Sequence, residues 1–199
     1  MDEKKDLFRH PGRIAVLVYP QVEELDFVGF YQVLQSVKKL RQEVDLVVEI
    51  VGTTASVHCA NGLMVQPHSL FNNLEGFDAV MIPGGRGWSQ LLKNIALLAE
   101  IRVMAQCGKL VCSVCTGAFV LAEAGVLKDR KATTHWRYFQ QLKPYCLEVL
   151  RDRVVRDGNV ITAGGVACSL DLGLNLIKHF YGAQFSKQLA KRLEIKLFD

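Results

Sequence analysis

The stretch LVCSVCTGAFVLAEAGVL, residues 110–127, joins an apolar run to a helix-like segment of small residues, with two cysteines three positions apart. Strand side chains alternate between opposite faces, so Cys112 points away from its neighbour and only Cys115 reaches the end of the run. A strand that turns sharply into a helix exposes the residue at the bend, as in a nucleophile elbow. The stretch therefore predicts a strand, a bend at Cys115 and a helix, the repeating unit of an α/β fold.

The cysteine pair has three interpretations: a redox pair, half of a zinc site, or one reactive thiol with an inert neighbour. A redox pair requires both cysteines near the first turn of a helix, and a structural zinc site requires four ligands, but no second CxxC occurs. The third interpretation is favoured, because N–H groups at the start of the helix favour a thiolate at Cys115. The other cysteines are predicted to be buried structural residues: Cys59, Cys107, Cys112, Cys146 and Cys168.

Outward from this stretch, buried strands and amphipathic helices alternate along the chain. Apolar runs rich in Val and Ile lie at 14–19, 44–52, 77–82, 109–114 and 159–163, and helical spacing occurs over 27–37, 91–101 and 170–180. This alternation predicts an α/β fold with a mainly parallel sheet. Between two extended runs in 53–68, Asn61-Gly62 predicts a small antiparallel hairpin.

Length and composition predict one domain. With 199 residues, half of them apolar, the chain is expected to form a single domain over 13–199 after a charged tail at 1–12. The tail lacks a secretion signal, and the longest apolar run is shorter than the ~20 residues that span a bilayer. A cytoplasmic protein with reduced thiols is expected. The net charge of +4 is scattered, which argues against nucleic-acid and membrane partners.

Candidate site residues follow the ends of the predicted strands, where sites form in open α/β sheets. Asp26 follows the first strand, Gly84 and Gly85 lie in the turn PGGRG, and His135 follows the short run KATT. With Cys115, these residues would bring a carboxylate, backbone N–H groups, an imidazole and a thiol to one edge. Each also has a structural interpretation: a helix N-terminal acid, a tight turn, or a packed histidine.

At these residues the chain resembles the ThiJ/PfpI superfamily, which has the class I glutamine amidotransferase-like fold, and within it the isocyanide (isonitrile) hydratase branch. The matching stretches are LDFVGFYQVL (25–34), FDAVMIPGGRG (77–87), SVCTGAFVLAEAGVLKDRKATTHW (113–136) and RVVRDGNVITAGGVACSLDLGL (153–174). The resemblance implies a flavodoxin-like three-layer sandwich, a homodimer, and no metal or organic cofactor. It also implies that Cys115 is the nucleophile, Asp26 its acidic partner, Thr116 a site residue, and Gly84 and Gly85 backbone donors.

For function, the resemblance implies a hydratase that converts an isocyanide, a small electrophile, to an N-formamide through a covalent thioimidate on Cys115. Two alternatives remain open. One is an enzyme acting on α-oxoaldehydes, as glyoxalases and deglycases do, with His135 as an accessory residue. The other is a ligand or redox sensor without catalysis, related to the ligand domain of AraC-type regulators.

Overall fold

A computed structural model of the chain describes residues 12–42 and 44–196. All but the last residue of the charged tail expected at 1–12 lies outside the described residues. In the described ranges, no helix combines the length and the apolar character needed to cross a bilayer.

The core of the protein is one seven-stranded sheet with the strand order β10-β11-β7-β6-β1-β2-β5. The strands are β1 (Arg13–Val18), β2 (Val47–Gly52), β5 (Ser69–Leu70), β6 (Ala79–Ile82), β7 (Leu110–Val114), β10 (Val154–Asp157) and β11 (Val160–Ala163). Only β10 runs antiparallel to its neighbour. The central order β2-β1-β6-β7-β11 is the flavodoxin-like order, which confirms the predicted fold class.

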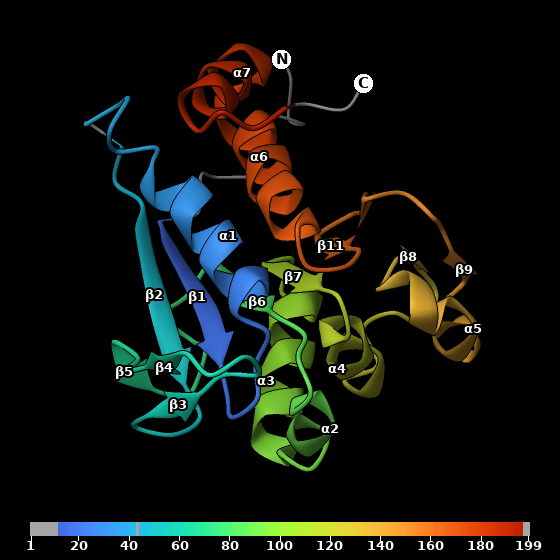
Figure 1. The fold of residues 1–199 in the computed structure, drawn as a ribbon. Helices are drawn as coiled ribbons and strands as arrows, with labels where there is room; N and C mark the ends of the chain where they lie inside the picture. The colour runs from blue at the N-terminus through green and yellow to red at the C-terminus, as the bar shows by residue number, and fades with distance from the viewer. Residues whose placement is uncertain (1–11, 43, 197–199) are drawn as a thin grey trace.

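Helices cover the sheet on both faces, completing three layers (Figure 1). On one face α1 (Glu24–Gln35) packs against α6 (Cys168–Tyr181), which also contacts α7 (Ala183–Arg192). On the other, α3 (Ile95–Gln106) and α4 (Gly117–Glu123) pack against each other and against β7. The remaining helices are short: α2 (Trp88–Leu91), α5 (Phe139–Leu142), η1 (Trp136–Tyr138) and η2 (Lys143–Tyr145).

Burial explains why the central strands read as continuous apolar runs. Every residue of β6, β7 and β11 is buried, because helices cover both faces of the sheet. The helix predicted from residue 91 is interrupted, since the side chain of Asn94 accepts a hydrogen bond from the Leu97 N–H and starts α3 at Ile95.

Two small two-stranded sheets lie outside the main sheet. In the first, β3 (Val57–His58) pairs antiparallel with β4 (Met64–Val65), which confirms the hairpin predicted at Asn61-Gly62. The turn requires glycine, because Gly62 has a φ of 102°. In the second, β8 (Lys131–Ala132) pairs with β9 (Glu148–Val149).

Candidate active site

Cys115 occupies the bend between β7 and α4 in a left-handed backbone conformation, with φ of 54°. This conformation costs a non-glycine residue about 1–2 kcal/mol, so the surrounding backbone must hold it. The Cys115 N–H donates to the carbonyls of Ala163 and Gly164 at 3.0 and 2.8 Å. Its carbonyl accepts a 2.7 Å hydrogen bond from the hydroxyl of Thr134. The bend is therefore a nucleophile elbow in geometry, as the sequence predicted.

Glycine at position 117 allows the elbow to pack against the neighbouring strand. A Cβ atom there would collide with the carbonyl oxygen of Ile82 and lie 2.9 Å from that of Pro83. Both carbonyls are rigid backbone at the end of β6. The elbow can therefore approach β6 only because residue 117 has no side chain.

Asp26 lies in the first turn of α1 and is fully buried. Its Oδ2 accepts a 2.8 Å hydrogen bond from the Gly84 N–H, while Oδ1 has no hydrogen-bond partner among the described residues. The alternative of an ordinary, solvated helix N-terminal acid does not account for the burial of Asp26 in the first turn of α1. It fits Glu24, whose carboxylate accepts hydrogen bonds from the N–H groups of Asn61 and Leu63 in the β3–β4 turn.

Asp26 and Cys115 influence each other's protonation. Burial raises the pKa of Asp26 to about 8; the Gly84 hydrogen bond opposes the rise and the charge of Glu23 adds to it. Burial also raises the pKa of Cys115 to about 12, and the charge of an ionised Asp26 adds to that rise. The N–H group at the helix start does lower the pKa of Cys115, as predicted, but burial outweighs it and the thiol keeps its proton near pH 7.

Backbone N–H groups from several segments lie around the thiol and the acid. The Gly84 N–H is engaged by Asp26, and the Gly85 N–H donates to the Thr116 hydroxyl at 3.2 Å. Both N–H groups are engaged in this structure, and the role of Gly84 and Gly85 as backbone donors to a substrate stays a prediction. The N–H groups of Thr116 and Val166 and the Thr116 hydroxyl instead stabilise the thiolate, which opposes the rise in the pKa of Cys115.

His135 lines the same cleft as Cys115 and is half-buried. Its Nδ1 accepts a 3.3 Å hydrogen bond from the Arg137 N–H, which leaves Nε2 to carry the proton of the neutral ring. Burial and the charge of Arg137 both lower the pKa of His135. The ring packs directly over Gly165, where a Cβ atom would collide with Cδ2.

A cleft of about 450 Å³ opens onto Cys115, which is 9% exposed. The residues that line it are Glu23, Gly85, Arg86, Trp88, Cys115, Thr116, His135, Arg137, Tyr138 and Val166. A small molecule can therefore reach the region of the thiol. Asp26 is fully buried and is not among the residues that line the cleft.

Two residues near the thiol, Tyr19 and Val166, were not among the predicted site residues, although each follows a predicted strand. Tyr19 directly follows β1 and donates a 2.8 Å hydrogen bond to the Pro83 carbonyl. Burial and the charges of Asp26 and Cys115 raise its pKa. Val166 follows β11 and the two glycines after it, and its φ of 24° is strained for a β-branched residue. The rule that located the other site residues at strand ends applies to both.

The other cysteines divide by burial. Cys59, Cys112 and Cys168 are buried as predicted, and Cys146 is half-buried. Cys107 is exposed at the end of α3, so the prediction of burial is wrong there. All of them are free thiols. Within residues 12–42 and 44–196, no three His, Cys, Asp or Glu side chains gather in a position to hold a metal ion.

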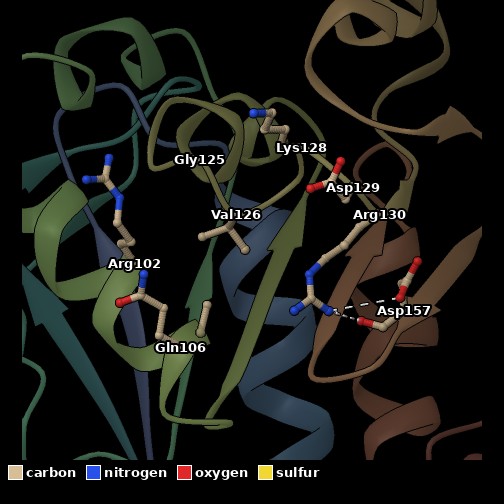
Figure 2. A pocket seen from close by; sticks show the side chains of 9 residues that line it. Arg102, Gln106, Gly125, Val126, Lys128, Asp129, Arg130 and Asp157 are labelled. Atoms are coloured by element: carbon tan, nitrogen blue, oxygen red, sulfur yellow. Dashed lines mark hydrogen bonds and ion pairs between the residues drawn. The ribbon is translucent and has the colours of Figure 1, made fainter.

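A second cavity, of about 400 Å³, lies at the opposite, amino-terminal edge of the sheet (Figure 2). Its wall includes Arg102, Lys128 and Arg130. Arg130 donates to the Asp157 carbonyl at 2.7 Å, and Arg102 to the Ala124 carbonyl at 2.8 Å. No cysteine is among the residues that line this cavity.

A flavodoxin-like sandwich with a thiol at a nucleophile elbow defines the class of this protein: α/β proteins of the glutamine amidotransferase-like fold. The profile of the DJ-1/PfpI family matches residues 12–179. The chain belongs to this family.

The chain is similar to individual proteins whose names describe different activities. Isonitrile hydratase of Pseudomonas putida is 37% identical over 183 residues, covering 92% of this chain and 78% of that protein. Glutathione-independent glyoxalase DJR-1.2 of Caenorhabditis elegans is 27% identical over 143 residues, covering 71% of this chain and 76% of that protein. The crystal structure of Drosophila melanogaster DJ-1beta superposes with a TM-score of 0.83 at 24% identity, over 93% of this chain and 98% of that one. This last likeness shows the fold.

Proposed function

We propose that the protein is a cysteine-dependent hydratase that converts an isocyanide to an N-formamide. The observation that carries the proposal is the pairing of a buried acid, Asp26, with the elbow thiol of Cys115 at the base of the cleft. The relative named isonitrile hydratase, 37% identical, supports the same reaction. Isocyanide hydration requires a nucleophile and a proton donor at one carbon, and this pair supplies both.

In the first half of the reaction, Sγ of Cys115 bonds to the terminal isocyanide carbon. Near pH 7 both groups hold their protons, since the pKa is about 8 for Asp26 and about 12 for Cys115. Asp26 donates its proton to the carbon and takes the thiol proton in return, so its own protonation state is unchanged. The product is a thioimidate in which carbon is joined to sulfur, hydrogen and nitrogen.

In the second half, water adds to the thioimidate carbon. The Asp26 carboxyl takes a proton from the water and gives its own to the nitrogen. Collapse of the resulting adduct breaks the carbon–sulfur bond, and the hydroxyl proton returns to the thiol through Asp26. The formamide leaves and Cys115 is restored. The free Oδ1 of Asp26 is the oxygen that exchanges these protons, because Oδ2 is held by Gly84.

Formamide production from a panel of aliphatic and aromatic isocyanides tests the proposal. Wild type should release one formamide for each isocyanide consumed, and the Cys115→Ala variant should release none. The matched control is Cys112→Ala, which removes a buried thiol of the same strand and should retain turnover when folded. Hydration by the Cys115→Ala protein, or no hydration of any isocyanide by wild type, would end the proposal.

A second candidate function is conversion of small α-oxoaldehydes. The presence of His135 in the same cleft as the thiol favours it, because a neutral imidazole can move protons between adjacent carbon and oxygen atoms. The glyoxalase from C. elegans supports the same alternative. Consumption of methylglyoxal without isocyanide hydration would select this function.

The resemblance to this family also leads us to propose a homodimer. Sedimentation equilibrium of the purified protein tests it, with a mass of 22.2 kDa for the monomer. A single species of that mass at micromolar concentrations would contradict the dimer.

A further inference from the structure

Two guanidinium groups line the cleft that contains Cys115. Arg86 lies in the turn after β6 and Arg137 in the 3-10 helix η1, so they come from distant segments. Elsewhere in the described chain, Arg13 and Arg153 each lie within 4.0 Å of a carboxylate. No such ion pair involves Arg86 or Arg137 among the described residues. These two cations are therefore available to a ligand.

The acidic groups around the cleft do not cancel this charge. Glu23 also lines the cleft, and its carboxylate accepts a 2.9 Å hydrogen bond from the side chain of Asn61. Asp26 is neutral near pH 7, because its pKa is raised to about 8. Two fixed positive charges therefore face one negative charge around the thiol.

Aromatic side chains form another part of the wall. Trp88 and Tyr138 line the cleft, and Phe119 packs behind both, with ring centroids 4.9 Å from Trp88 and 5.9 Å from Tyr138. Such packed rings offer flat apolar surfaces. The Arg137 guanidinium lies over the Trp136 ring, 5.1 Å from its centroid. Stacking through the flat face leaves the N–H edge of a guanidinium able to bind a carboxylate.

We propose that the substrate of this site is an anionic molecule, with a carboxylate on a planar or bulky apolar group. Arg86 and Arg137 would bind the carboxylate, Trp88 and Tyr138 would pack against the apolar group, and the electrophilic carbon would reach Cys115. For the reaction itself this inference rests on the proposed hydratase function. The charge preference is a property of the cleft and can be measured separately.

Alkylation of Cys115 by two probes of equal size measures that preference without any turnover. Iodoacetate and iodoacetamide each transfer a two-carbon group to sulfur, with loss of iodide and release of the thiol proton to the buffer. Rates are read by mass spectrometry at Cys115 and, in the same molecule, at the exposed Cys107. In wild type the iodoacetate-to-iodoacetamide rate ratio should be higher at Cys115 than at Cys107.

Substitution then assigns the preference to the arginines. The Arg86→Gln/Arg137→Gln protein should lower the rate ratio at Cys115 by about three- to tenfold, the effect of two partly exposed charges. The control is Arg151→Gln, an exposed arginine outside the cleft, which should leave the ratio unchanged. Raising the salt to 0.5 M should weaken the preference in wild type. Equal ratios at the two cysteines, or no effect of the double substitution, would overturn the inference.

A matched pair of isocyanides separates this inference from the proposed function. Wild type should hydrate 4-isocyanobenzoate with a lower KM than its methyl ester, and the double substitution should remove that difference. Hydration of both with equal KM would refute the anionic preference and leave the hydratase function intact. No hydration of either, together with a retained alkylation preference, would refute the hydratase function and leave the anionic preference standing.

Discussion

The Gly84 N–H donates a 2.8 Å hydrogen bond to Oδ2 of Asp26, and Oδ1 of the same buried carboxyl group has no partner among the described residues. A buried oxygen without a partner costs free energy when it carries charge. Protonation of Oδ1 removes that cost, in agreement with a pKa of about 8 for Asp26. The glycine turn after β6 thus determines which oxygen of Asp26 holds the exchangeable proton.

Replacing Asp26 by Asn should separate reactivity of the thiol from turnover. The amide cannot exchange protons, so isocyanide hydration should fall by about 10²- to 10⁴-fold. The same change removes the negative charge that adds to the raised pKa of Cys115, so alkylation by iodoacetamide above pH 8 should become faster than in wild type. Initial rates of both reactions check this prediction. Slower alkylation in a folded variant would contradict the coupling of the two groups.

Stability should depend on pH through Asp26. Folding raises its pKa from 3.8 to about 8, so the folded protein holds a proton that the unfolded chain releases between those values. The stabilisation is complete below pH 3.8 and is lost as pH rises through 8. Between pH 5.5 and 7.5, wild type should lose roughly 1–3 kcal/mol of unfolding free energy relative to Asp26→Asn.

Urea unfolding of both proteins at several pH values measures this difference. Both proteins contain the same other titratable groups, including His135 and His179, whose pKa values are lowered in the folded state. The contributions of these groups therefore cancel in the difference between the two unfolding free energies. A difference between the two proteins that does not change with pH would show that Asp26 is ionised when folded.

Adding a methyl group at Gly165 should displace His135. A Cβ atom there would collide with the imidazole ring, whereas one at Gly164 would lie 3.3 Å from Cys168 Sγ and away from His135. If His135 assists proton transfer, Gly165→Ala should lower kcat by a factor similar to that of His135→Gln. Gly164→Ala, the matched neighbour, should remain close to wild type. Wild-type kcat in His135→Gln would exclude a catalytic role for the imidazole.

Gly117→Ala should destabilise the elbow more than a comparable change in another helix. At Gly117 the new atom meets rigid backbone carbonyls of Ile82 and Pro83. At Gly173 in α6 the overlap is smaller, because the nearest atom, Cβ of Val33, would lie 2.8 Å away. We expect a loss of about 3 kcal/mol for Gly117→Ala and about 1 kcal/mol for Gly173→Ala. Similar losses in chemical denaturation would mean that β6 can adjust.

The parts of the fold predicted correctly depend on local pattern. The buried strands β6, β7 and β11 could be predicted from the sequence, because strands covered on both faces consist of continuous runs of apolar residues. The interruption before α3 and the exposure of Cys107 were missed, because both depend on how one residue is oriented at a helix end. The convergence of Asp26, Gly84 and Cys115 was predictable, since each follows a strand in a mainly parallel sheet.

The sequence by itself determined the alternation of the central strands with helices, the bend at Cys115 and the family, because these follow from residue types at fixed spacings. Tertiary structure decided the protonation of the site: burial, which involves segments far apart in the chain, raises the pKa of both Asp26 and Cys115. It also decided that Gly84 donates to the acid, and that Arg86 and Arg137 share one cleft with the thiol. Desolvation and charge depend on distances in space, which spacing along the chain does not specify.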